Sequence, residues 1–251
     1  MVKVAILVDG GFYKKRAHFL FGEKTPEERA KELITYCMRH LKQDEFYGEE
    51  KVVLYRIFYY DCPPSSKNIT HPLTGKTINL EKSQIYKWSN SFFDALCKKR
   101  KVAIRKGELL ESSVGFILRD GVLKKLCNKT ITIDQLEEKD FKLEMQQKGV
   151  DMRIGLDIAS LANKKLVDTI VLIAGDSDFV PAAKHARREG IDFILDPMHQ
   201  AIKPSLMEHI DGIHTPTNKP GSRKPDKLCK KVFESDITVD AFTKGLNCKT
   251  D

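Results

Sequence analysis

Ile170-Val-Leu-Ile-Ala-Gly-Asp-Ser-Asp-Phe179 is an apolar, β-branched run that ends in a glycine and two carboxylates. Such a run predicts a strand that is buried on both faces of a parallel sheet. Asp176 and Asp178 follow that strand directly, at the edge where open α/β sheets hold their sites. Two carboxylates so close together repel one another, and a bound cation relieves that repulsion. The stretch therefore predicts a parallel α/β fold with a metal site at one edge of the sheet.

The N-terminus repeats this arrangement. Residues 2–8 predict a first buried strand, which Asp9, Gly10 and Gly11 follow. The two glycines carry no side-chain bulk, so backbone N–H groups can approach an anion there. Asp9 is equally suited to cap a helix that begins after the strand. Two buried strands that both deliver acid at the same edge indicate a metal site and, with it, phosphate chemistry.

The rest of the chain alternates between strand and helix patterns. Thr25 followed by Pro26 is a strong signal for the start of a helix. The alternating order predicts a parallel sheet with right-handed crossovers. The expected helices are 26–43, 81–99, 150–164 and 181–189, and the further expected strands are 51–60, 169–174 and 191–195.

The middle of the chain departs from this alternation. Residues 61–80 are typical of a polar loop, and residues 101–126 predict two or three short strands with a turn at 119–121. Residues 134–147 are highly charged and predict a connector. The expected division is an α/β domain over 1–214, in which 61–147 is an insertion or elaboration, and a basic, flexible linker and tail over 215–251.

The composition limits the classes of protein to consider. No run of about 18 apolar residues occurs, so no transmembrane helix and no membrane partner are expected. The apolar run at the N-terminus is too short for a signal peptide. The six cysteines lie far apart without a Cys-x-x-Cys pair, which argues against a zinc knuckle or a disulfide framework. We therefore expect a cytoplasmic protein.

The net charge of +8 suggests a polyanionic partner. Acids at the expected site together with excess lysine and arginine elsewhere favour nucleic acid, because a basic surface holds the backbone while carboxylates hold metal at the scissile phosphate. A solvated helix face explains each basic run as well. The candidate RNA-binding residues are Lys14, Lys15 and Arg16 after the first strand, and Lys184, Arg187 and Arg188 after the acidic pair.

Asp151 is a further candidate for the metal site. It opens the helix expected at 150–164, where an acid is favourable with the helix dipole, and its carboxylate can face Asp9 across the strand tips. Asp157 lies about 240° further around that helix, so it cannot share a face with Asp151 and is expected in a supporting or water-mediated role. Carboxylates without a Cys or His cluster select a hard cation, Mg²⁺ or Mn²⁺. The chemistry would be metal-assisted hydrolysis of a phosphodiester.

Three segments together resemble the NYN domain, and most closely its LabA-like branch in the PIN-like nuclease superfamily. They are Val8-Asp9-Gly10, Lys148-Gly-Val-Asp151 with Asp157 downstream, and Leu172 to Pro181. The resemblance implies a PIN-like three-layer α/β/α sandwich with a central, mainly parallel sheet. It also implies a Mg²⁺- or Mn²⁺-dependent ribonuclease, an endoribonuclease, that acts on single-stranded or structured RNA. By position, the residues that resemble the family's metal-binding acids are Asp9, Asp151, Asp176 and Asp178.

Phe12 departs from the family pattern, because many NYN proteins have asparagine three residues after the first aspartate. A polar contact to substrate or to a metal-bound water is therefore expected to be missing. A non-catalytic RNA-binding or regulatory protein that keeps the acidic pocket remains an alternative, and homo-oligomerisation remains open. A haloacid-dehalogenase-type phosphatase is disfavoured because Gly11 stands where that class needs a second acid. A Toprim domain is disfavoured because Asp9 stands where that class has glutamate.

Overall fold

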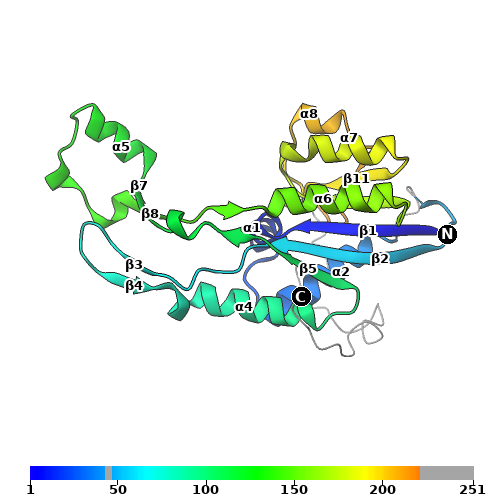
Figure 1. Ribbon diagram of the computed structural model, residues 1–251, viewed down its shortest axis with the longest axis horizontal. Coiled ribbons are helices and arrows are strands. Elements are labelled where there is room, and N and C mark those ends of the chain that lie inside the picture. Colours follow the sequence, from blue (N-terminus) through cyan, green and yellow to red (C-terminus); the bar gives the residue numbers. More distant parts are fainter. Residues whose placement is uncertain (43–46, 221–251) are drawn as a thin grey trace. The chain divides into compact units, whose positions relative to one another are not determined.

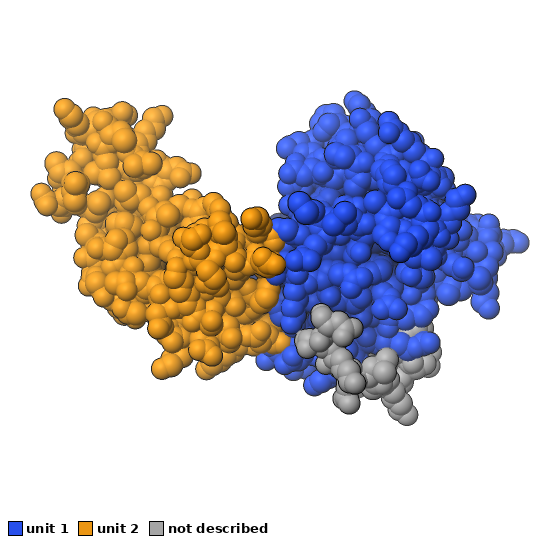
Figure 2. All heavy atoms as spheres, in the orientation of Figure 1, with its two compact units in different colours: residues 1–61, 91–107, 149–251 blue, residues 62–90, 108–148 orange. Residues whose placement is uncertain are grey.

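The computed structural model describes residues 1–42 and 47–220. The chain divides into two compact units, coloured separately in Figure 2. Unit 1 contains residues 1–61, 91–107 and 149 onward, and unit 2 contains residues 62–90 and 108–148. Most of the tail expected at 215–251 lies outside the described residues. Within the described part of the chain, no helix is long and apolar enough to cross a bilayer.

Unit 1 is built on a six-stranded sheet in the order β12-β11-β10-β1-β2-β5. Every pairing in it is parallel, as the sequence predicts. The two central strands are the most apolar, and Val4 to Val8 of β1 and Ile170 to Ile173 of β10 are fully buried. The strands are β1 (Val2–Asp9), β2 (Val52–Asp61), β5 (Val102–Lys106), β10 (Thr169–Ile173), β11 (Asp192–Asp196) and β12 (Gly212–Ile213).

Helices flank this sheet in a mixed α/β fold, consistent with the expected PIN-like sandwich. The connections after β1 and β2 lead toward the β5 edge, whereas those after β10 and β11 lead toward the β12 edge. Right-handed crossovers in opposite directions place their helices on opposite faces. Figure 1 shows α6 and α7 side by side on one of these faces. The helices of unit 1 are α1 (Gly10–Phe21), α2 (Pro26–Arg39), α6 (Val150–Asn163), α7 (Val180–Arg188) and α8 (Pro204–Met207), with the 3₁₀ turn η5 (Ser177–Phe179) before α7. The helix α4 (Gln84–Cys97) belongs to unit 2 up to residue 90 and to unit 1 from residue 91.

The direction in which successive strands are added to the sheet therefore reverses between β1 and β10. Such a switch point leaves a crevice outside the carboxyl ends of the two strands, because their connections turn to opposite faces. The register pairs Val8 of β1 with Ile173 of β10. Asp9 and the Gly175–Asp176 segment thus leave the sheet side by side.

The expected helix start at Thr25 is confirmed. Its side chain accepts a hydrogen bond from the Glu28 backbone N–H, and the Glu28 carboxylate accepts one from the Thr25 backbone N–H. This capping box satisfies backbone donors at the first turn. The helix ends at Arg39, a few residues before the expected end at residue 43.

Unit 2 contains more regular structure than the sequence predicts. The expected polar loop at 61–80 holds the hairpin β3 (Asn68–Thr70) and β4 (Thr77–Asn79). The expected turn at 119–121 begins the helix α5 (Asp120–Cys127) instead. The expected connector at 134–147 includes β8 (Phe141–Glu144), which pairs antiparallel with β7 (Gly115–Leu118), and β9 (Gln147–Lys148), which pairs with β6 (Glu108–Leu109).

A small apolar cluster explains why these polar segments become ordered. Ile69, Leu80 and Val114 are buried together, and Phe116 packs against them. The ring of His71 lies 4.6 Å from that of Phe116. Each segment contributes too few apolar residues for its own core, so the strands form only because distant partners bury them jointly.

Candidate functional site

Strand ends deliver acids to one edge of the sheet in unit 1. Asp9, Asp61 and Asp196 are the last residues of β1, β2 and β11. Asp176 follows β10 and accepts a hydrogen bond from the Asp178 backbone at 3.2 Å, which starts η5. Because these strands are parallel, their carboxyl ends lie at the same edge. Asp9 and Asp176 leave the two strands that flank the switch point.

Asp9 caps α1 and is held in an unfavourable electrostatic position. Its Oδ1 accepts a hydrogen bond from the Phe12 backbone at 3.1 Å. Burial raises its pKa to about 6, and the nearby Asp151 and Asp61 add to this rise while the Phe12 hydrogen bond opposes it. The structure therefore brings Asp151 close enough to Asp9 for the two charges to interact.

Asp151 links Asp9 to the acidic pair. Gly149 adopts a left-handed conformation with φ of 80° just before α6, so Asp151 falls in the first helical turn. Burial raises the pKa of Asp151, and Asp176 and Asp178 raise it further. The predicted acids at the end of β1, in the first turn of α6 and at the start of η5 thus interact electrostatically. Their mutual repulsion is the property that a divalent cation would relieve.

The donor set fits a hard cation in kind. Carboxylate oxygens are the ligands that Mg²⁺ and Mn²⁺ prefer. Within residues 1–42 and 47–220, however, no three His, Cys, Asp or Glu side chains stand together as a group that could hold a metal ion. A closed set of ligands would require these carboxylates to converge further.

The side chain of Asp157, on α6, contacts residues near the ends of two neighbouring strands. Its Oδ2 accepts a hydrogen bond from the Tyr60 hydroxyl at 2.7 Å and pairs with Arg105 Nε at 3.0 Å. Tyr60 and Arg105 are themselves register partners on β2 and β5. Asp157 therefore ties α6 to the sheet, a position that suits the expected supporting role.

Asp61 is a residue that sequence reasoning missed. It is 1% exposed, and its Oδ2 accepts a hydrogen bond from Tyr59 at 3.0 Å and an ion pair from Lys14 at 2.7 Å. The sequence did carry a signal, because Asp61 ends a strand as Asp9 does. The ammonium group of Lys14, an expected RNA-binding residue, is thus engaged with a buried carboxylate.

Lys203 is a second missed residue. Its ammonium group donates to the Ser177 hydroxyl at 3.1 Å. Ser177 lies between Asp176 and Asp178, so this cation stands beside the acidic pair. No local pattern marks Lys203, because the contact joins segments 26 residues apart.

The remaining cations predicted to bind RNA fall into two groups. Arg16 is structural, since Nε and Nη2 both donate to the Met198 carbonyl oxygen, at 3.2 and 2.7 Å. Lys15 is exposed.

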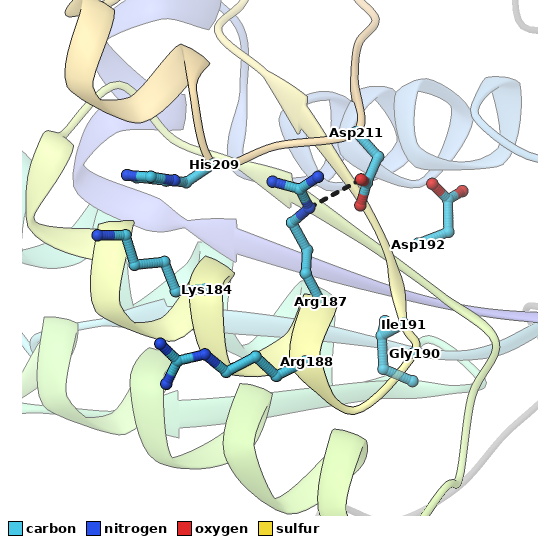
Figure 3. Close-up of a pocket in the computed structure, with 8 residues that line it drawn as sticks. All are labelled: Lys184, Arg187, Arg188, Gly190, Ile191, Asp192, His209 and Asp211. Carbon is cyan, nitrogen blue, oxygen red and sulfur yellow. Dashed lines mark ion pairs between the residues drawn. The ribbon is translucent and has the colours of Figure 1, made fainter.

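On α7, a shallow hollow of about 760 Å³ is lined by Lys184, Arg187 and Arg188, and Figure 3 shows Arg187 turned toward Asp211. These two form an ion pair of 2.8 Å. Lys184, Arg187 and Arg188 are all exposed.

Asp9→Asn is expected to stabilise the metal-free protein at neutral pH. The raised pKa means that the stability Asp9 contributes is fully present below its unfolded pKa of 3.8 and is lost as pH rises through about 6. Asparagine keeps the cap without a charge. For this half-buried group we expect a gain of about 2 kcal/mol at pH 7.5 in EDTA, which disappears near pH 4. Urea unfolding at both pH values measures it, and an equal gain at both would contradict the assignment.

Residues 97–212 match the family model of the NYN domain. The matched segment includes Asp151, Asp176 and Asp178, begins after Asp9, and supports an NYN domain protein. A search of curated proteins found no match. A protein of unknown function from Vibrio parahaemolyticus is similar over 84% of this chain and 91% of its own, at 12% identity and a TM-score of 0.42. A maltogenic α-amylase from Thermotoga neapolitana is similar over 84% and 48%, at 9% identity and a TM-score of 0.21. These two likenesses are too weak to support an argument, and the fold rests on the strand order.

Proposed function

From the NYN match as premise, we propose that this protein is a metal-dependent ribonuclease. The observation that carries the proposal is the electrostatic coupling of Asp9, Asp151, Asp176 and Asp178 at the switch point of the sheet. The raised pKa values of Asp9 and Asp151 mean that their charged forms are costly to the folded protein, and a site that holds Mg²⁺ or Mn²⁺ accounts for that cost. These four residues are the proposed ligands, with Asp157 in support.

The chain's own groups would prepare the site for hydrolysis. When bound, the metal would lower the pKa of an attacking water and stabilise the leaving oxygen. Glycine at position 10 lets α1 begin directly under Asp9, because a Cβ there would lie 2.6 Å from the Tyr60 carbonyl oxygen. Lys203 supplies a positive charge next to Asp176 and Asp178 that can meet an RNA phosphate.

The basic residues on the surface would hold the RNA backbone. Lys15, Lys184 and Arg188 are exposed, so their charges are accessible to phosphate. The engaged side chains of Lys14, Arg16 and Arg187 would act instead by shaping this surface. The LabA-like branch, endonucleolytic cleavage, the cytoplasmic location, homo-oligomerisation and the domain boundary at residue 214 stay predictions.

A non-catalytic RNA-binding protein is the second candidate. It explains the basic surface equally well, but it gives no reason for the electrostatic cost at Asp9 and Asp151. Phe12 is the feature that favours it, because the family's amide is missing at this position. The two candidates therefore differ in whether RNA is cut.

Cleavage of a labelled single-stranded RNA by the full chain tests the proposal. We expect cutting with Mn²⁺ or Mg²⁺ and none with EDTA, because the carboxylates need a cation to activate water. Binding of the same RNA is measured in parallel by fluorescence anisotropy. Binding without cleavage under either metal would favour the non-catalytic candidate. Cleavage that persists in EDTA would rule out the metal site.

A further inference from the structure

The turn at 197–200 has an unusual backbone. Met198 and His199 have φ values of 45° and 62°, and the Gln200 backbone donates to the Pro197 carbonyl at 2.8 Å. Residues other than glycine rarely adopt positive φ. Two in succession persist only where the surroundings hold them, and such places cluster at functional sites. The turn follows β11, at the same sheet edge as the acids.

Hydrogen bonds from buried and partly buried side chains hold the turn at 197–200 in place. Asp196 is fully buried, and its Oδ1 accepts a hydrogen bond from the Met198 backbone at 2.8 Å. Arg16 holds the Met198 carbonyl oxygen from α1. His199 Nε2 lies 3.1 Å from the Thr217 hydroxyl. Both polar groups of the Met198 backbone are therefore held, and Gln200 follows from a rigid support.

The turn presents Gln200 to the acidic segment. Its Nε2 lies 3.3 Å from the position that a Cβ on Gly175 would occupy. The ring of Phe12 covers the same position, with Cδ2 at 3.0 Å. Gly175 directly precedes Asp176, so the amide of Gln200 and the ring of Phe12 are neighbours beside the proposed site. Gln200 is exposed, which leaves its amide accessible to a ligand.

We infer that Gln200 binds the RNA substrate and supplies the amide that is missing at Phe12. Its Nε2 would donate a hydrogen bond to a phosphate oxygen next to the cleaved bond, which a side-chain amide can do in a fixed orientation. The apolar ring of Phe12 would then serve as a support for Gly175 and Gln200. This inference rests on the proposed ribonuclease function.

Gln200→Ala tests the inference in the full chain. We expect kcat/KM for RNA cleavage to fall about tenfold or more, and RNA binding to weaken, because one hydrogen bond to a charged group is lost. In Gln200→Glu, kcat/KM should fall further, because a carboxylate repels phosphate. Gln84→Ala, which removes an exposed amide from α4, is the matched control and should change neither quantity.

Rescue separates a contact with substrate from a structural effect. The double variant Phe12→Asn with Gln200→Ala places an amide at the family's position and should recover most of the lost kcat/KM. A folded double variant that stays as slow as Gln200→Ala would contradict the inference that the Gln200 amide replaces the one missing at Phe12. Wild-type kcat/KM and RNA affinity in Gln200→Ala would overturn the inference as a whole. If wild type does not cut RNA, the proposed function fails, and the affinity measured in Ca²⁺ still decides whether Gln200 contacts RNA.

Discussion

Asp176→Asn is expected to reduce metal-dependent RNA cleavage by about a thousandfold or more. Asparagine can still accept the hydrogen bond from the Asp178 backbone that starts η5, so the local turn is retained. It removes one negative charge from the proposed metal site, and a bound metal contributes several kcal/mol of transition-state stabilisation, where each 1.36 kcal/mol is a factor of ten. Initial rates on labelled RNA in Mn²⁺ measure the change.

Asp94→Asn is the matched control, because Asp94 is an exposed carboxylate on α4 of the same unit. It should cut RNA at the wild-type rate. A shift in thermal stability with Mn²⁺ gives a second readout that does not depend on activity, and it should be smaller for Asp176→Asn than for wild type. Equal cleavage by Asp176→Asn and wild type would show that the site is assigned to the wrong residues.

The parts of the fold that the sequence predicts are those with a local cause. β10 is a continuous apolar run, and Asp176 and Asp178 follow it without a gap, so burial and direction could be inferred together. The start of α2 was marked by Thr25 and Pro26 in the same way. The sequence also predicts that Asp151, at the start of a helix, faces Asp9 across the strand tips, and Asp151 contributes to the raised pKa of Asp9.

Features with a distant cause could not be predicted. Lys14 and Arg16 look like a solvated basic run, yet their partners are Asp61 and Met198, 47 and 182 positions away. The strand β8 looks like a charged connector until β7 pairs with it. Local patterns give the period and polarity of a segment, but they do not say which remote group will neutralise a charge or bury a strand.

Asp196, at the sheet edge that holds the proposed site, also depends on partners that are distant in the sequence. Its Oδ2 accepts a hydrogen bond from the Tyr36 hydroxyl at 2.6 Å and lies 3.0 Å from His40 Nε2. Its Oδ1 accepts from the Thr215 hydroxyl at 2.7 Å as well as from the Met198 backbone. One buried carboxylate thus joins α2, the turn that carries Gln200 and the segment after β12.

Asp196→Ala is therefore expected to destabilise the protein by about 3–5 kcal/mol, because the substitution leaves several buried polar groups without their acceptor. For a chain of this size that corresponds to a fall in Tm on the order of 10 °C.

Asp192→Asn, at the other end of β11, is the matched control. Burial and the neighbouring Asp211 raise the pKa of Asp192, so removal of its charge should leave stability unchanged or increased at pH 7. Thermal unfolding of both variants decides the matter. If they lose equal stability, Asp196 does not hold the edge together, and the rigid support proposed for Gln200 must come from Arg16 alone.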